Sequence, residues 1–200
     1  MAKKGLLLVI SGPSGVGKGT VCAGLLAKHP EISASLSSTT RSKRKGEVEG
    51  VHYNFITERV FQESIENAEF LEWAKVYNNY YGTRKQVVDE KISLGRDVLL
   101  EIDTVGAKHV KTHVPEAILI FIMPPNKGEL ARRLRGRATD SEEVIEKRLS
   151  CFEAELKEIG YYDYVVFNHN VQEAVKQVET IIQAEKSRVS YLYDDIAAMF

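Results

Sequence analysis

Four short runs of apolar residues stand out along the chain, at residues 6–10, 98–102, 117–123 and 164–167. Each run is nearly continuous and is shorter than a typical helix. Such a run is typical of a strand that is buried on both faces of a sheet, because both rows of its side chains then meet apolar neighbours. The runs therefore predict strands in the interior of a sheet.

Segments with helical patterns lie between these runs, at residues 18–28, 84–94, 105–113 and 171 to about 188. Gly95 directly follows the second segment, as expected at the end of a helix. Buried strands that alternate with helices predict an α/β fold, in which helices cover both faces of a parallel sheet.

Two stretches interrupt this alternation. Residues 32–83 are polar, rich in Ser, Thr and Tyr, and alternate like half-exposed strands around one short helix at residues 58–67. Residues 126–158 follow Pro124 and Pro125, and their pattern is helical and charged. An apolar stripe at helical spacing runs through this second stretch at Ile145, Leu149, Phe152, Leu156 and Ile159.

We interpret the whole chain, residues 1–200, as one domain with two insertions. The insertions cover about residues 32–83 and about residues 126–158. The core then comprises about residues 1–31, 84–125 and 159–200.

The stretch GPSGVGKGT resembles the phosphate-binding loop G-x-x-x-x-G-K-[ST], and it lies between an expected strand and an expected helix, as that loop requires. Glycines let backbone N–H groups turn toward phosphate oxygens, and the helix N-terminus adds a partial positive charge. Lys18 can then reach the β and γ phosphates. The candidate ATP-binding residues of the loop are Gly12, Pro13, Ser14, Gly15, Val16, Gly17, Lys18, Gly19 and Thr20.

Candidate magnesium ligands lie in two places. Gly19 occupies the position of the usual magnesium-binding hydroxyl, and Thr20 follows it within the first turn of the helix. Thr20 can therefore reach Mg²⁺ directly or through water. Glu101 and Asp103 lie on the same side of a strand end, where ligands of parallel sheets bind. Alternatively, they form a solvated strand end, with Asp103 as the cap of the next helix.

The first insertion contains candidate anion-binding side chains. Arg41 and Arg44 can hold a dianionic phosphate with bidentate bonds, and Tyr53 and Tyr81 can add hydroxyl donors. Taken alone, residues 41–45 can also be a solvated charge run or a small nucleic-acid patch. Tyrosines at strand spacing are, equally, common packing residues.

The second insertion is rich in arginine, in the stretch ELARRLRGRATDSEEVIEKRLS. Glu129 can pair with Arg133 four positions later, and a solvated helix with surface ion pairs accounts for most of these charges. Gly136 interrupts the helical pattern and suggests a hinge.

Composition sets limits on the class of protein. Hydrophobic residues make up 44% and charged residues 28%, and the net charge of −1 gives no general attraction to nucleic acid or membrane. Cys22 and Cys151 predict free thiols, and the spacing of His109 and His113 offers a metal pair without a third ligand. The apolar run near the N-terminus is too short for a signal peptide or a membrane span, so we expect a cytoplasmic protein without nucleic-acid or membrane partners. The sequence leaves open whether it is a monomer or a homo-oligomer.

Seven motifs resemble those of guanylate kinases and stand in the same order: GPSGVGKGT, SSTTR, GEVEGVHYNF, EFLEWA, NYYGT, EID and RRLRGR. The resemblance runs from about Gly5 to the last expected helix. It implies the P-loop nucleoside-monophosphate-kinase fold, a parallel sheet flanked by helices. The first insertion is then a mixed α+β GMP-binding subdomain, and the second is a helical lid over ATP.

The same resemblance implies the roles of individual residues. The GMP-phosphate holders correspond to Arg41, Arg44, Tyr53 and Tyr81, and the guanine readers to Ser37, Glu72 and Thr83. Glu101 and Asp103 join this GMP-binding set. The catalytic charges correspond to Lys18, Arg41, Arg133, Arg137 and Arg148. ATP contacts outside the loop correspond to Arg137 and to Asn168, near the adenine.

The chemistry of Glu72 supports its assignment independently. Guanine presents two donors side by side, N1–H and the 2-amino group, and one carboxylate can accept both. Adenine presents an acceptor at N1 and is repelled. Without the surrounding motif, Glu72 is more simply an exposed strand residue.

Three residues depart from the family pattern. Gly19 stands where many members have serine, Glu101 where many have aspartate, and Ala138 where glycine is common. None of the departures removes a charged group, so they bear on magnesium geometry more than on activity.

The expected reaction is ATP + GMP to ADP + GDP with Mg²⁺ as cofactor. The attacking phosphate oxygen is already ionised, so no general base is needed. Two alternatives are a non-catalytic guanylate-kinase-like binding module and a kinase for another nucleoside monophosphate. Lys18 and the lid arginines argue against the first alternative, and Glu72 argues against the second.

Overall fold

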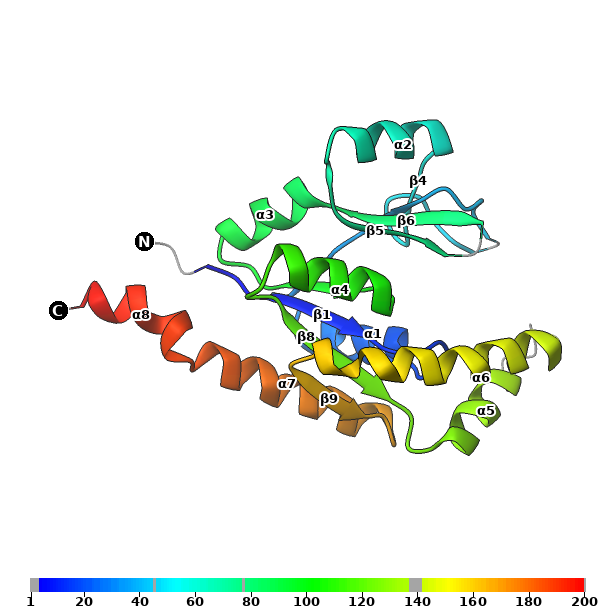
Figure 1. Cartoon of the computed structure of the whole chain (residues 1–200). Helices are drawn as coiled ribbons and strands as arrows, with labels where there is room; N and C mark the ends of the chain where they lie inside the picture. The colour runs from blue at the N-terminus through cyan, green and yellow to red at the C-terminus, as the bar shows by residue number, and fades with distance from the viewer. Residues whose placement is uncertain (1–3, 45, 77, 137–141, 200) are drawn as a thin grey trace.

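The computed structural model describes residues 4–44, 46–76, 78–136 and 142–199 (Figure 1). The strands of the core sheet are β1 (Leu7–Ser11), β2 (Ser33–Ala34), β7 (Val98–Glu101), β8 (Ile118–Met123) and β9 (Tyr164–Phe167). Their order across the sheet is β2–β7–β1–β8–β9, and every pair of neighbours is parallel.

Two hydrophobic cores cover the faces of this sheet. The helices around it are α1 (Lys18–Lys28), α3 (Lys85–Ser93), α4 (Thr104–His113) and α7 (Val171–Lys186). Leu8 and Ile10 of β1 pack with residues of α1 and α7, whereas Leu7 and Val9 pack with residues of α3 and α4. All four side chains are buried, which explains why β1 is apolar at consecutive positions.

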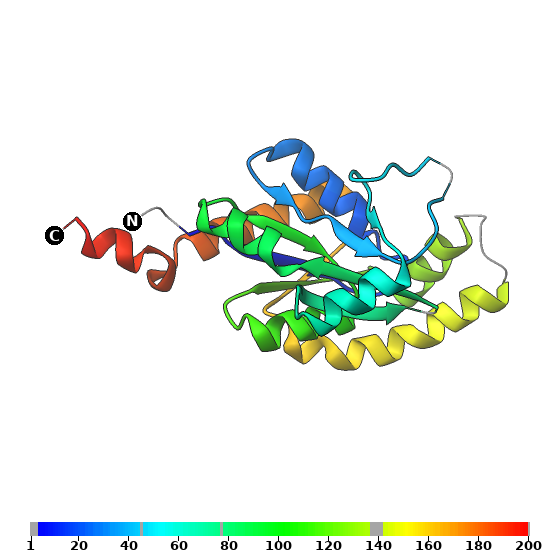
Figure 2. The same cartoon turned by 90° about the horizontal axis from the view of Figure 1, so that it is seen from above.

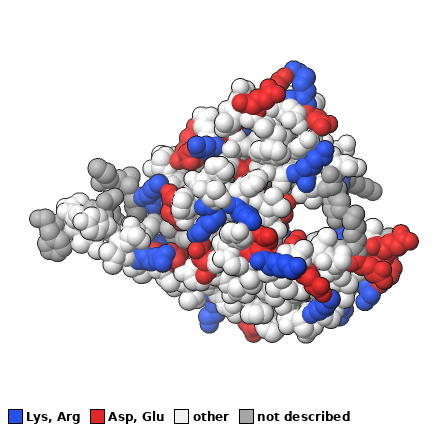
Figure 3. Space-filling model, in the orientation of Figure 1, with Lys and Arg blue, Asp and Glu red and all other residues white. Residues whose placement is uncertain are grey.

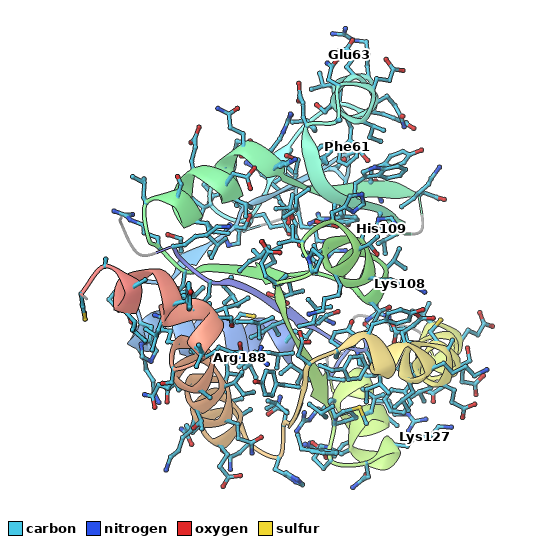
Figure 4. The ribbon with its side chains drawn as sticks, turned by 60° about the vertical axis from the view of Figure 1, so that its left-hand side comes forward. Phe61, Glu63, Lys108, His109, Lys127 and Arg188 are labelled. Carbon is cyan, nitrogen blue, oxygen red and sulfur yellow. The ribbon has the colours of Figure 1, made fainter. Side chains whose placement is uncertain are left out.

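A second, smaller sheet stands above the core sheet in Figure 1. Its elements are β3 (Ser37–Thr39), β4 (Asn54–Phe55), α2 (Glu58–Glu66), β5 (Phe70–Val76) and β6 (Asn79–Arg84). The strand order is β4–β3–β6–β5, with β3–β6 and β5–β6 antiparallel. Phe61 of α2 points toward this sheet and stacks on Phe70 with ring centroids 4.4 Å apart, while Glu63 points outward (Figure 4). The subdomain thus has its own small aromatic core.

The second insertion is helical. It contains α5 (Lys127–Arg135), α6 (Glu142–Lys157) and the 3₁₀ helix η1 (Glu158–Tyr161). The expected apolar stripe faces inward, since Ile145 and Phe152 are buried in the core on the α1 face of the sheet. Lys108 of α4 donates a hydrogen bond to Glu158 at 3.1 Å, and Figure 4 shows Lys108 on the side of α4 that faces this helical segment.

The last helix, α8 (Val189–Ala197), extends from the end of α7, at the opposite end of the molecule from α6 (Figures 1 and 2). Throughout the described residues, no helix combines the length and the apolar character needed to cross a bilayer. Cys22 and Cys151 are free thiols, as predicted, and Cys22 is buried.

The expected core strands and helices are all present, with ends within two residues of the predicted positions. One core strand was not predicted. The sequence interpretation assigns Ser33 and Ala34 to the first insertion, but they form β2 and pair with β7 in the core sheet. This edge strand is too short and too polar to show an apolar pattern.

Candidate active site

The loop between β1 and α1 has the shape of a phosphate-binding loop. Gly12 and Gly17 adopt φ angles of 137° and 96°, which residues with a side chain rarely adopt. A Cβ atom would lie 2.5 Å from the Ile122 carbonyl oxygen at Gly12 and 2.6 Å from Nδ2 of Asn168 at Gly17. Both the backbone angles and the surrounding space therefore require glycine at these two positions.

Lys18 begins α1, and its ammonium group lies against the loop. Nζ donates hydrogen bonds to the carbonyl oxygens of Gly12, at 2.5 Å, and Pro13, at 3.1 Å. Burial lowers the pKa of Lys18, although the charges of Glu101 and Glu155 act in the opposite direction. Because this ammonium group is poorly hydrated, an anion that binds in the loop would stabilise its positive charge.

Glu101 lies beside the first turn of α1. It ends β7 and pairs in register with Ile10 of β1. A Cβ atom at Gly19 would lie 3.3 Å from Oε1 of Glu101, so the glycine leaves room for this long carboxylate. Two of the departures noted in the sequence, Gly19 and Glu101, are therefore neighbours in space. Burial raises the pKa of Glu101, and the charge of Lys18 partly offsets this.

Asp103 caps helix α4. Its Oδ1 accepts a hydrogen bond from the N–H of Gly106 at 2.8 Å, which is the alternative role that the sequence left open. Asp103 also lines the cleft described next, so the cap does not remove it from the site. In the described ranges, no three His, Cys, Asp or Glu side chains are grouped as a preformed metal site.

A cleft of about 630 Å³ separates the phosphate-binding loop from the small sheet. Figure 3 shows the molecule hollowed between the small sheet and the helical insertion. The candidate residues that line the cleft are Gly12, Ser14, Lys18, Ser37, Tyr53, Glu72, Tyr81, Glu101, Asp103 and Arg148. A larger cavity of about 800 Å³, lined by Leu7, Ile92 and Arg188 among others, includes none of these residues. The lining residues of the smaller cleft, and not its volume, therefore identify it as the candidate active site.

Three polar side chains form one row across the small sheet, and two of them, Ser37 and Glu72, line the cleft. The strand register places Ser37 of β3 and Glu72 of β5 on either side of Thr83 of β6. The Thr83 hydroxyl donates a hydrogen bond to Oε1 of Glu72 at 2.6 Å. Glu72 is buried, with 5% of its surface exposed, and burial raises its pKa to about 7. The sequence alternative of an exposed strand residue is therefore wrong for Glu72.

Tyr53, Tyr81 and Arg41 of the first insertion lie close to one another. Tyr53 and Tyr81 meet edge to face, with ring centroids 6.0 Å apart, and both line the cleft. The Cζ atom of Arg41 lies 5.5 Å from the Tyr53 ring, while Arg44 is exposed. Arg41 is further bound by Glu47, with its Nη2 2.7 Å from Oε1.

Two arginines of the second insertion contact the phosphate-binding loop or its neighbour Asn168. Arg133 donates hydrogen bonds to the carbonyl oxygens of Val16, at 3.2 Å, and Asn168, at 2.9 Å. Arg148 approaches the Ser14 hydroxyl at 3.4 Å. Asn168 is buried and donates from Nδ2 to the Val16 carbonyl oxygen at 2.8 Å, so it also braces the loop.

The family model of guanylate kinase matches residues 4–185, which include the loop, the small sheet and the lid helices. The chain belongs to the guanylate kinase family.

Individual relatives agree with this family. A guanylate kinase of Clostridioides difficile is 52% identical over 188 residues, covering 94% of this chain and 92% of the relative. A guanylate kinase of Carboxydothermus hydrogenoformans is 48% identical over 191 residues and covers 94% of each chain. The crystal structure of guanylate kinase from Anaplasma phagocytophilum aligns with a TM-score of 0.78 at 34% identity, over 94% of this chain and 89% of that chain. The predicted family and fold class are confirmed.

Not every predicted site residue faces the cleft. Within the described ranges, Arg41, Arg44 and Thr83 are not among the residues that line the cleft. Arg133 and Asn168 instead contact the backbone of the phosphate-binding loop. Thr20 is exposed in the first turn of α1. Arg137 lies outside the described residues.

Glu155 lines the cleft from α6, and the sequence analysis did not select it. Its Oε2 atom is buried and has no hydrogen-bond partner in the part of the chain that the structure describes. Burial raises its pKa, and the charge of Lys18 partly offsets this. In the sequence, Glu155 is one of several glutamates of a charged helix, so no local signal marks it.

Proposed function

We propose that this cleft transfers the γ-phosphoryl group of ATP to GMP, with ATP on the phosphate-binding loop and GMP on the small sheet. As a member of the guanylate kinase family, the chain is a kinase that acts on these two small substrates. The observation that carries the proposal is that Glu72, buried and hydrogen-bonded by Thr83, lines the same cleft as Ser37 and Lys18. This favours a GMP kinase over a binding module or a kinase for another nucleotide.

The side chains of Ser37, Thr83 and Glu72 recognise guanine by hydrogen bonding. A Glu72 carboxylate accepts from N1–H and from the 2-amino group of the base. The hydroxyls of Ser37 and Thr83 bond the remaining polar edge and keep the carboxylate in place. An adenine at this position would leave the buried carboxylate unpaired, which is a costly arrangement.

The basic groups act on the phosphates. Arg41 and Arg44, together with the hydroxyls of Tyr53 and Tyr81, hold the phosphate of GMP. Its ionised oxygen is the nucleophile, so the main obstacle is repulsion between two polyanions. Lys18 and the lid arginines 133, 137 and 148 offset this repulsion and the charge on the transferred group. Closure of the lid then excludes water from the reaction.

The donor set near the loop fits Mg²⁺. The candidate ligands are oxygens: the exposed Thr20 hydroxyl in the first turn of α1, the Glu101 and Asp103 carboxylates, and Oε2 of Glu155, which has no hydrogen-bond partner within the described residues. These carboxylates are not grouped as a preformed metal site in the described ranges, so we expect only one or two of them to contact the ion. Mg²⁺ usually takes one or two carboxylates together with water and substrate phosphates. When bound, the ion supplies positive charge to the phosphates of ATP. The cytoplasmic location and the absence of nucleic-acid and membrane partners stay predictions from the sequence.

A coupled ADP-release assay with ATP and a panel of GMP, AMP, dTMP, CMP and UMP tests this function. We expect kcat/KM for GMP to exceed the value for AMP by about 10²-fold or more, because AMP leaves the guanine-reading groups unpaired. Equal values for two or more nucleotides would overturn the assignment of the row as a guanine site.

The raised pKa of Glu72 predicts a pH dependence of guanine binding. The free carboxyl is protonated below its pKa of about 7, and only the ionised form accepts two donors. Guanosine affinity should therefore rise about tenfold per pH unit from pH 5 to pH 7 and level off above it. Burial is the main cause of the raised pKa, and the nearby Asp103 charge adds to it. Calorimetry with guanosine avoids the titration of the GMP phosphate, and Glu72→Gln should give a flat profile.

We expect Thr20 to provide the hydroxyl that Gly19 lacks. Thr20→Val keeps the shape of the side chain and removes its oxygen. The variant should need about tenfold more Mg²⁺ for half-maximal activity, while calorimetry should give an unchanged affinity for GMP. An unaltered Mg²⁺ titration curve would rule out a role of Thr20 at the metal.

A further inference from the structure

Glu47 is a further charged group in the loop that carries Arg41 and Arg44, and none of the roles above uses it. Its carboxylate accepts from Nη1 of Arg41 at 3.0 Å and from Nη2 of Arg41 at 2.7 Å. The same carboxylate accepts from the backbone N–H of Arg44 at 2.7 Å. One side chain therefore ties together both arginines assigned to the GMP phosphate.

This ion pair is largely shielded from water. The side chains of Arg41 and Glu47 are 12% and 18% exposed. The hydrogen bonds from Arg41 lower the pKa of Glu47 to about 2, and the same contact raises the pKa of Arg41. The pair is thus ionised at neutral pH.

The contacts with Glu47 and Ser42 leave one edge of the Arg41 guanidinium for other partners. Of its five N–H groups, two bind Glu47 and one more, on Nη1, donates to the Ser42 carbonyl oxygen at 2.8 Å. The remaining donors are Nε–H and the second Nη2–H, which form the other bidentate fork of a guanidinium. The Arg41 guanidinium itself lies against the cleft lining, because its Cζ atom is 5.5 Å from the centre of the Tyr53 ring and Tyr53 lines the cleft.

We propose that Glu47 is a positioning residue for the GMP phosphate. Glu47 binds the Nη1–H and Nη2–H pair of Arg41, so that the Nε–H and the second Nη2–H can point at the phosphate. It also accepts from the backbone N–H of Arg44 and so fixes the backbone there. An unpaired arginine would have to be ordered when GMP binds, whereas here it is ordered beforehand. The proposal rests on GMP as the substrate of this cleft.

The charge of Glu47 could instead weaken GMP binding by competing with its phosphate for Arg41, and the experiment must distinguish this competition from positioning. A carboxylate on Arg41 resembles a phosphate, so it would compete with GMP if both needed the same fork. Competition predicts that removing the charge tightens GMP binding. Positioning predicts that removing it weakens GMP binding and leaves guanosine, which has no phosphate, unaffected.

Glu47→Gln keeps the size of the side chain and removes its charge. We expect the Kd of GMP to rise about 10- to 100-fold, because charge-assisted bonds hold Arg41. The Kd of guanosine and the KM of ATP should change less than about twofold. Glu49→Gln is the matched control, since Glu49 lies in the same loop and its Oε2 accepts only a backbone bond, from Phe55 at 2.9 Å.

A double-mutant cycle with Arg41→Lys completes the experiment. If Glu47 acts through Arg41, adding Glu47→Gln to Arg41→Lys should raise the Kd of GMP by less than about threefold. Glu47→Asp should retain part of the wild-type affinity if Glu47→Gln fails to fold. Tighter GMP binding, an equal loss for guanosine, or full additivity with Arg41→Lys would each overturn the proposal. A wild-type protein that binds guanosine but gives no GDP from GMP would instead contradict the proposed function.

Discussion

Lys18→Met is expected to lower kcat by about 10³-fold, equivalent to ~4 kcal/mol in the barrier. The ammonium group donates to carbonyl oxygens of the loop when no phosphate is present. When ATP binds, we expect this ammonium group to contact the β and γ phosphates, where negative charge shifts during transfer. Methionine has a similar length and no charge, so it fills the space without stabilising that charge. Steady-state kinetics with ATP and GMP measure the effect.

The folded state should tolerate this change. Burial lowers the pKa of Lys18, which means that the buried charge itself costs stability. We therefore expect a melting temperature within a few degrees of wild type, whereas a large drop would attribute the lost activity to misfolding. Lys28→Met is the matched control, because Lys28 ends the same helix and is half exposed in an ion pair with Glu179. Near-normal kcat in Lys18→Met would show that the loop binds ATP without a catalytic lysine.

Glu72→Gln should lower kcat/KM for GMP by about 10²-fold or more, a loss of ~3 kcal/mol. Glutamine keeps one acceptor, but its amide N–H₂ group faces a donor of guanine. Use of AMP should change far less, because the wild-type site already excludes adenine. The GMP/AMP ratio of kcat/KM should therefore collapse.

A glutamate outside the cleft serves as the control for this variant. Glu69 immediately precedes β5 and pairs with Arg84 on the surface. Glu69→Gln should leave the GMP/AMP ratio unchanged. If Glu72→Gln also leaves that ratio unchanged, then the buried carboxylate is not the reader of the base.

The sequence predicted the core because burial on both faces leaves a strong signal. The apolar residues of β1 alternate between two hydrophobic cores, so the strand is apolar at four consecutive positions, Leu7 to Ile10. The phosphate-binding loop was equally predictable, because its glycines serve backbone angles that other residues rarely adopt. The helical structure of the second insertion was predictable from the apolar stripe that contains Ile145 and Phe152.

Other features depend on contacts between distant parts of the chain. Glu72 is buried because the small sheet packs near α4, where a Cβ atom at Gly106 would lie 2.6 Å from its Oε2. Its local sequence gives no sign of this burial. The double role of Asp103, as helix cap and cleft residue, also needs the coordinates of two elements. Glu47 and Glu155 resemble surface glutamates until the structure brings them to Arg41 and to the cleft.

Transfer of labelled phosphate tests the central claim most directly. The protein is incubated with ATP labelled in the γ-phosphoryl group, together with GMP, and the labelled products are separated. The account predicts that the label appears in GDP, in an amount equal to the ADP formed, and that this transfer is lost in Lys18→Met. Label that appears as inorganic phosphate, or that stays in ATP while GMP is bound, would contradict it.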